Sequence, residues 1–185
     1  MDFPTGKYKV IYADPPWSYR QKGGPHGKRG MAAAHYSTMS TQEIGNLPVQ
    51  DIATDDALLF LWSTFPNLPA ALKVIAAWGF EYKTAAFVWV KKNKRSGTNF
   101  FGMGAWTRAN AECCLLGARP GAKAGKLVKS HSVQQIIESP VHEHSRKPGE
   151  VRERIVQLVG DIPRIELFAR KKTLGWDAWG DEVEE

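Results

Sequence analysis

Residues 8–17, YKVIYADPPW, predict both the fold class and the position of a functional site. Tyr8–Ala13 is a short run of β-branched and aromatic residues, which is typical of a buried strand. Pro15 and Pro16 then fix the backbone φ angle and remove two N–H donors, so the chain after the strand is stiff and its carbonyls are free. In open α/β sheets, ligands bind at the carboxyl ends of strands. We therefore expect a site at residues 14–17.

Strand-like and helix-like segments alternate along the rest of the chain, which indicates an α/β fold. Apolar runs predict further strands at residues 57–62, 85–90, 112–117 and 164–169, with a short strand near 133–137. These runs alternate little between polar and apolar residues, as in a parallel or mixed sheet that helices cover on both faces. The chain has 185 residues, no visible repeat and no long linker, so we expect a single domain over residues 1–185.

Two helices are expected in the first half of the chain. The pattern Ser40-Thr-Gln-Glu43 is a capping box that opens a short helix, which Pro48 ends. The second helix closes at Gly79, and helical spacing predicts its apolar face from Leu68, Leu72, Ile75 and Ala76.

A third helix is expected near the C-terminus. Pro148 can occupy its first position, where a missing N–H is harmless, and Gly160 stops it. We assign its Arg152 and Arg154 to a solvated face. Trp62, Trp78 and Trp89 fall in or beside regular elements and are expected in the core.

The charge distribution favours a polyanionic partner. The net charge is +6 and the pI is about 9.3, and lysines and arginines that neutralise phosphates release counterions. The basic residues gather in three loop-like segments, 20–35, 92–110 and 119–142, and loops often carry binding residues. We expect these loops to contact the substrate. The candidate contacts in the first two are Lys22, Arg29, Lys94, Arg95, Trp106 and Arg108. For Trp106, packing within the protein is an equal alternative to contact with a base.

Several classes of protein are disfavoured. The apolar runs are far shorter than the roughly 20 residues of a membrane span, and no secretory signal opens the chain, so we expect a cytoplasmic protein without membrane contact. Cys113 and Cys114 are adjacent and apolar in context, so they are predicted to be buried free thiols. His142 and His144 make a poor metal pair without a third ligand, so no metal is expected.

The residue types at 14–17 suit the recognition of an amino group on a flat ring. A carboxylate and a rigid carbonyl side by side accept both hydrogens of one amino group, and an adjacent tryptophan can stack on a base. These groups together could hold adenine by its exocyclic amine. Nitrogen's lone pair then faces an electrophilic methyl group, and positioning does most of the work without a metal or a covalent enzyme intermediate.

Over nearly its whole length the chain resembles the MT-A70 family of adenine N6-methyltransferases, especially small bacterial and bacteriophage members. The resemblance rests on these segments: IYADPPWSY (11–19), HYSTMS (35–40), LLFLWST (58–64), FVWVKK (87–92), WTRANAECCLLG (106–117), EHSRKPGEV (143–151), RIELFAR (164–170) and GWDAWGDEV (175–183). It implies a Rossmann-like, S-adenosylmethionine-dependent methyltransferase fold in permuted order, with a mixed, mostly parallel sheet and helices on both faces. It also implies base flipping, since adenine N6 is not reachable within a stacked duplex.

The resemblance also implies roles for individual residues. Asp14 and the Pro15 carbonyl would hold the adenine amine, Pro16 would shape the turn, and Trp17 would pack against the target base. Tyr36 matches an aromatic residue that approaches substrate or cofactor. The residues expected on the cofactor side are Asp14, Lys147 at the cofactor's carboxylate, Glu166, Arg170 near the ribose hydroxyls, and Asp181 and Glu182 at ribose and adenine.

The expected activity is therefore methyl transfer from S-adenosylmethionine to adenine N6 in DNA. Two alternatives remain open from the sequence: an RNA adenine methyltransferase, and a non-catalytic nucleic-acid-binding subunit. The small size leaves little room for a separate recognition domain, so a homodimer is one way to supply more DNA surface.

Overall fold

The structure is a computed structural model that describes residues 2–18, 38–104, 106–141 and 146–183. Its centre is a seven-stranded sheet in the order β5-β3-β4-β2-β1-β6-β7. The strands are β1 (Tyr8–Ala13), β2 (Ala53–Ser63), β3 (Glu81–Lys92), β4 (Ala111–Ala118), β5 (Ile136–Pro140), β6 (Arg164–Leu167) and β7 (Asp177–Trp179). Only β4 runs against its neighbours, β2 and β3, and the other strand pairs are parallel. The prediction of a mixed, mostly parallel sheet is confirmed.

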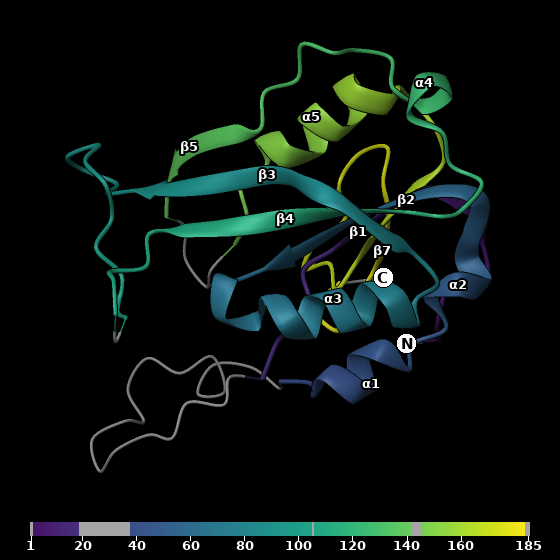
Figure 1. Cartoon of the computed structure of the whole chain (residues 1–185), viewed down its shortest axis with the longest axis horizontal. Helices are drawn as coiled ribbons and strands as arrows, with labels where there is room; N and C mark the ends of the chain where they lie inside the picture. Colours follow the sequence, from purple (N-terminus) through teal and green to yellow (C-terminus); the bar gives the residue numbers. More distant parts are fainter. Residues whose placement is uncertain (1, 19–37, 105, 142–145, 184–185) are drawn as a thin grey trace.

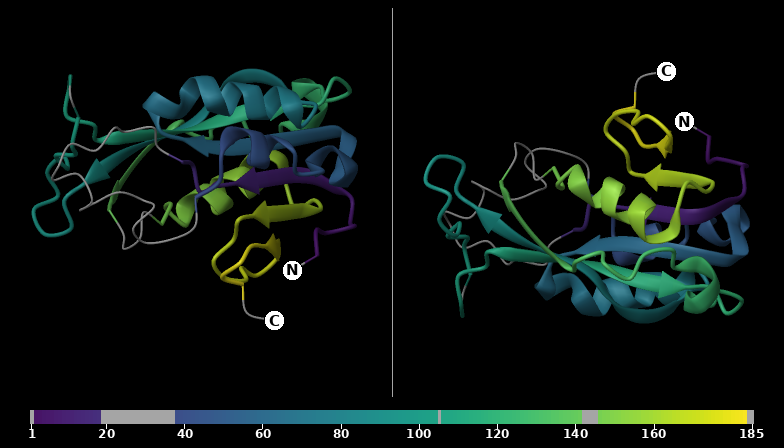
Figure 2. Two further views of the ribbon diagram at one scale, coloured as in Figure 1. Left: turned by 90° about the horizontal axis from the view of Figure 1, so that it is seen from below. Right: turned by 90° about the horizontal axis from the view of Figure 1, so that it is seen from above.

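Helices lie on both faces of this sheet, as predicted (Figures 1 and 2). α1 (Thr41–Gly45), α2 (Val49–Ile52) and α3 (Leu68–Ala77) contribute to the core on one face, where alternate β-strand residues such as Ile11 and Leu59 meet them. α5 (Glu150–Val159) covers the other face and packs against Val10 and Phe60. A 3-10 turn, η2 (Phe65–Asn67), precedes α3, and a single turn, α4 (Ala124–Leu127), lies between β4 and β5.

Most of the strand ends that matter for function lie at one edge of the sheet. Ala13, at the end of β1, pairs with Leu61 of β2 and with Leu167 of β6, so these parallel strands end together. Because β4 is antiparallel, it begins at this edge, where Cys113 pairs with Ser63. Residues that follow β1 and β6 therefore meet residues that open β4.

The tryptophan, cysteine and glycine predictions are confirmed. Trp62, Trp78 and Trp89 are buried in the core, and Cys113 and Cys114 are buried free thiols whose pKa values burial raises. Gly79 and Gly160 end their helices with positive φ angles of 76° and 85°, a conformation that side-chain-bearing residues rarely adopt. The Ser40–Glu43 capping box is present. No helix in the described part of the chain is long and apolar enough to cross a bilayer.

Several predicted boundaries were wrong. α1 ends at Gly45, and Pro48 instead precedes α2. Pro148 lies before the N-cap Gly149 of α5 rather than inside the helix. The strand expected near 133–137 is β5, at Ile136–Pro140, so segment 119–142 contains α4 and β5 and is not one loop.

The buried face of α3 also differs from the prediction. Ala71, Val74, Ile75 and Trp78 are buried, whereas Leu72 and Ala76 face solvent. The reason is Trp78: its indole Nε1 donates to the Ile44 carbonyl at 2.9 Å, which turns the helix so that the stripe ending at Trp78 faces the core.

The rotation of α3 predicts unequal effects of two truncations. Ile75→Ala removes a side chain that is 1% exposed, so we expect the free energy of unfolding to fall by about 2–5 kcal/mol. Leu72→Ala, on a side chain that is 37% exposed, should cost less than about 1 kcal/mol. Urea unfolding of both variants measures the difference, and equal losses would contradict the placement of this helix.

Candidate active site

A pocket of about 460 Å³ opens at the edge where β1, β2 and β6 end. Its lining includes Asp14, Pro15, Pro16 and Trp17 after β1, Glu112 at the start of β4, and Lys147 before α5. The C-terminal segment supplies the other wall, with Arg170, Trp179, Asp181 and Glu182. The structure therefore brings together predicted residues from three distant parts of the sequence.

The backbone at the two prolines forms a tight turn. The Trp17 N–H donates to the Pro15 carbonyl at 2.8 Å, and the Met39 N–H donates to the Pro16 carbonyl at 2.9 Å. A carbonyl oxygen has two lone pairs, so the Pro15 carbonyl retains acceptor capacity at the pocket wall. The segment is thus anchored to the chain before α1.

Trp17 is largely buried rather than free at the pocket mouth. Its indole Nε1 donates to the Trp62 carbonyl at 2.9 Å, and only 6% of the residue is exposed. The ring still contributes to the pocket lining. Its first role is therefore structural, because it ties residues 14–17 to the end of β2.

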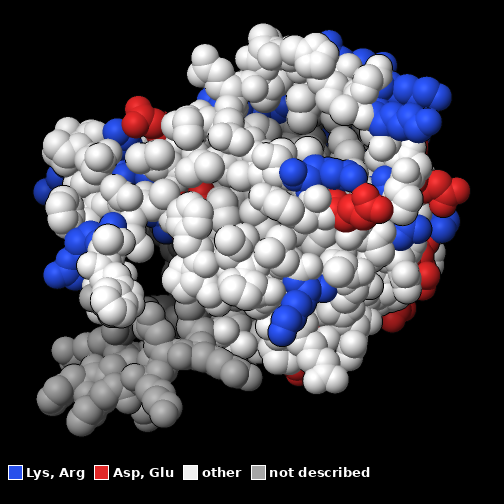
Figure 3. Space-filling model, in the orientation of Figure 1, with Lys and Arg blue, Asp and Glu red and all other residues white. Residues whose placement is uncertain are grey.

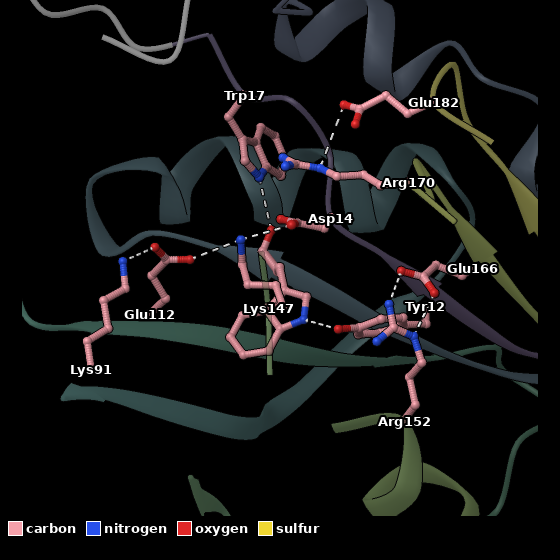
Figure 4. Close-up of polar contacts among 11 residues, drawn as sticks. Tyr12, Asp14, Trp17, Lys91, Glu112, Lys147, Arg152, Glu166, Arg170 and Glu182 are labelled. Carbon is pink, nitrogen blue, oxygen red and sulfur yellow. Dashed lines mark hydrogen bonds and ion pairs between the residues drawn. The ribbon is translucent and has the colours of Figure 1, made fainter. Parts of the chain in front are cut away.

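A row of alternating charges runs through the site: Lys91, Glu112, Lys147 and Asp14 (Figure 4). Lys147 Nζ lies 2.9 Å from Asp14 Oδ2 and 3.2 Å from Glu112 Oε2. Lys91 Nζ donates to Glu112 Oε1 on the far side. Lys147 and Glu112 are buried, whereas the Asp14 side chain keeps 25% exposure toward the pocket.

Burial and pairing shift these pKa values in different directions. Burial raises the pKa of Asp14, and Lys147 only partly offsets the rise. Burial would also raise the pKa of Glu112, but Lys147 and Lys91 together hold it below its ordinary value. Burial would lower the pKa of Lys147, yet Asp14 and Glu112 raise it above its ordinary range. Lys147 therefore stays charged, and Asp14 is the carboxylate in this row that is most easily protonated.

A second ion pair lies beside this row. Arg152 donates from Nε to Glu166 Oε2 at 2.7 Å and from Nη2 to Glu166 Oε1 at 2.5 Å. Its guanidinium also lies 5.3 Å from the centre of the Tyr12 ring. Glu166 lines a smaller cavity of about 140 Å³ that adjoins the larger pocket, since Asp14, Lys147 and Arg170 belong to the lining of both.

The prediction that Arg152 and Arg154 form a solvated face was wrong. Arg152 pairs with Glu166, and Arg154 donates to Glu150 and to the Gln134 and Ile136 carbonyls. Helical periodicity places the two residues on opposite flanks of the apolar stripe. Only the tertiary structure shows that Glu166 lies beside one flank and the chain entering β5 beside the other.

Four features shape the C-terminal wall. Arg170 Nε lies 3.8 Å from Glu182 Oε1. Phe168 has a φ angle of +60°, which is an outlier for a bulky residue and marks local strain beside the site. Phe168 also packs edge-on against Trp179, at 5.6 Å between ring centres. The indole Nε1 of Trp179 is buried without a hydrogen-bond partner within the described residues.

Among the described residues, the remaining predicted contacts do not line the pocket. Lys94, Arg95, Trp106 and Arg108 lie exposed in the long loop between β3 and β4. Lys22, Arg29 and Tyr36 lie outside the described residues, as do His142 and His144. Within the described ranges, no group of three or more His, Cys, Asp or Glu side chains could hold a metal ion.

Glu112 is the site residue that sequence reasoning missed. The signal was present, because Glu112 is an acidic residue at the start of the apolar run ECCLLG in a predicted buried strand. A buried carboxylate needs a cationic partner. Its partners, Lys91 and Lys147, lie 21 and 35 residues away, so only the fold identifies them.

Removing the Glu112 charge should destabilise the protein. Breaking a buried ion pair on one side costs about 3–5 kcal/mol, so Glu112→Gln should lower the free energy of unfolding at pH 7 by about 3 kcal/mol or more. Glu81→Gln, which breaks an exposed pair with Lys83, is the matched control and should leave stability unchanged.

The pH dependence of this loss has a definite sign. The folded-state pKa of Glu112 is lowered, so its stabilisation is present above the ordinary glutamate pKa of about 4.3 and is lost as pH falls through the folded value. The difference between wild type and Glu112→Gln in urea unfolding should therefore shrink at acid pH. A difference that stays constant from neutral to acid pH would argue against an ionised Glu112.

Comparison with known proteins agrees with this geometry. The profile of the MT-A70 family matches residues 8–182. The Type II methyltransferase M.MunI of a Mycoplasma species is 34% identical in an alignment that covers 97% of this chain and 79% of that protein. A probable N(6)-adenosine-methyltransferase MT-A70-like protein of Oryza sativa subsp. japonica is 29% identical, over 96% of this chain and 23% of its own length.

The human N(6)-adenosine-methyltransferase catalytic subunit METTL3 is 26% identical, over 97% of this chain and 29% of its own length. The chain thus spans about a quarter of these larger eukaryotic relatives. Since the profile match extends from the first strand through the C-terminal wall of the pocket, the chain belongs to the MT-A70 family.

Proposed function

We propose that this protein transfers a methyl group from S-adenosylmethionine to the exocyclic N6 amine of adenine in DNA. One observation carries the proposal: Asp14 and Pro15 line the same pocket, with Lys147 bound to one oxygen of Asp14. The other oxygen of Asp14 and the Pro15 carbonyl are two acceptors for the hydrogens of one amine. Membership of the MT-A70 family supports the same chemistry.

The pocket residues fit S-adenosylmethionine by their chemistry. The volume of about 460 Å³ lies within the usual range for small-molecule sites, which is roughly 300–1,000 Å³. Lys147 suits the donor's carboxylate, Arg170 suits its ribose hydroxyls, and Asp181 and Glu182 suit its ribose and adenine. When bound, this cofactor supplies an electrophilic methyl group on a sulfonium.

The protein's own contribution is to hold the amine. Lys147 engages Asp14 Oδ2, so Oδ1 accepts one hydrogen of the amine. The Pro15 carbonyl accepts the other with its second lone pair. With both hydrogens held, the nitrogen lone pair points at the methyl group, and orientation lowers the barrier.

The assignment of the substrate to DNA rests on one comparison. The Mycoplasma relative is named a Type II methyltransferase and is matched over most of its length, whereas the N(6)-adenosine-methyltransferases are matched over a quarter of theirs. The net charge of +6 suits any nucleic acid. RNA methylation is the second candidate, because the relatives named for adenosine share the same span. The complete Asp14-Pro15-Pro16-Trp17 motif argues against a non-catalytic subunit.

Methyl transfer should depend on the Asp14 charge. We expect Asp14→Asn and Asp14→Ala to lower the transfer of radiolabelled methyl to unmethylated DNA by about 100-fold or more, the scale of losing one pre-organised contact to the reacting group. Asp161→Asn, at an exposed aspartate before β6, is the control and should retain full activity. Label that appears in RNA and not in DNA would reassign the substrate. A folded wild type that labels neither would remove the enzyme assignment from the isolated chain.

The acid limb of the activity profile should report Asp14. Asp14 must be ionised to accept the amine, and burial raises its pKa, so kcat/KM should fall at a pH above the ordinary aspartate pKa of about 3.9. In Lys147→Met the cation that offsets this rise is gone, so the acid limb should move to still higher pH, whatever happens to the maximal rate. Circular dichroism at each pH checks that the variant stays folded. An acid limb that stays in place or moves to lower pH would contradict this role of Lys147.

A further inference from the structure

The loop between β3 and β4, residues 93–110, projects from the edge of the sheet that carries the pocket (Figures 1 and 2). It leaves β3 next to Lys91 and Lys92 and re-enters the sheet one residue before Glu112. Lys91 and Glu112 belong to the charge row that ends at Asp14. The loop is therefore attached directly to the site.

The described residues 100–104 and 106–110 form a lobe within this loop that is closed at its base. The Phe100 N–H donates to the Lys91 carbonyl, and the Lys91 N–H donates to the Asn110 carbonyl, both at 2.8 Å, so both ends of the lobe are tied to one residue. A Cβ at Gly102 would lie 1.9 Å from the Ala109 carbonyl oxygen. A glycine is required there because the two limbs approach too closely for a side chain.

The lobe presents large apolar side chains to solvent. Phe101, Met103 and Trp106 are 76%, 87% and 100% exposed. Clustered apolar exposure of this kind marks an interaction surface, because water disfavours it. The alternative that Trp106 packs within the protein is excluded by its full exposure.

The charge of the loop identifies the partner as nucleic acid. Residues 93–110 contain Lys94, Arg95 and Arg108 and no Asp or Glu. Lysine and arginine side chains also gather at this end of the molecule in the space-filling view (Figure 3). Two copies of such a loop would repel each other, whereas phosphates would attract it.

We propose that the lobe is a wedge that enters duplex DNA beside the target adenine, with Trp106 filling the space that the extruded base leaves. The inference rests on the proposed function. A base must leave the stack before its amine can reach Asp14 in the pocket, and unstacking is unfavourable. Apolar side chains inserted between base steps offset that cost, and an indole stacks on any base. Lys94, Arg95 and Arg108 contact the flanking phosphates.

The wild type first methylates DNA, and the positions of the methylated adenines give its target sequence. The test then compares two duplexes that contain this sequence. In the first duplex, thymine lies opposite the target adenine. In the second, an abasic position lies opposite it, so the adenine has no pairing partner and is extruded more easily. Trp106→Ala should lower kcat/KM on the paired duplex roughly 5- to 100-fold, the scale of losing one aromatic stack, and much less on the abasic duplex. Leu174→Ala, at another fully exposed apolar residue, should change neither.

Each other outcome has a definite meaning. Equal losses on the two duplexes would show a contact unrelated to extrusion and would overturn the wedge, as would no loss on either. A wild-type dimer that becomes a monomer in Trp106→Ala, measured by light scattering, would assign the lobe to a second copy of the chain and also overturn it. A folded wild type that methylates no DNA, so that no site can be read and no duplex designed, would overturn the proposed function itself before any substitution is compared.

Discussion

The site depends on one buried ammonium group, that of Lys147, held between the carboxylates of Asp14 and Glu112. An unpaired charge at this depth would be strongly unfavourable, so each partner requires the others. Lys147 reaches Asp14 across 133 residues of sequence and joins the segment before α5 to the end of β1. The geometry around Asp14, and the ease with which it is protonated, follow from this contact.

Trp62 connects this charge row to the rest of the molecule. Its carbonyl accepts the Trp17 indole, its own Nε1 donates to the Tyr12 hydroxyl at 2.7 Å, and its ring lies 5.6 Å from Lys147 Nζ. Tyr12 in turn faces the Arg152–Glu166 pair. One core residue therefore contacts the turn at the two prolines and Lys147 directly, and the Arg152–Glu166 pair through Tyr12.

The sequence predicted correctly those features of the fold that depend on residues close together in the chain. The strand at Tyr8–Ala13, the capping box at Ser40 and the stops at Gly79 and Gly160 depend on neighbouring residues and were predicted correctly. The face of α3 and the surroundings of Arg152 were predicted wrongly. Both depend on what lies opposite the helix: the Ile44 carbonyl for Trp78, and Glu166 for Arg152.

The sequence by itself determined the α/β class, the site after the first strand, and the motif that marks the MT-A70 family, because strand propensity, proline geometry and residue order are local properties. Only the tertiary structure decided that Glu112 belongs to the site, that Glu166 lines a smaller cavity adjoining the pocket, and that Trp106 is fully exposed on the lobe. The physical reason is that charge pairing and burial depend on neighbours in space. Here the antiparallel course of β4 brings Glu112 and the lobe to the edge where the parallel strands end.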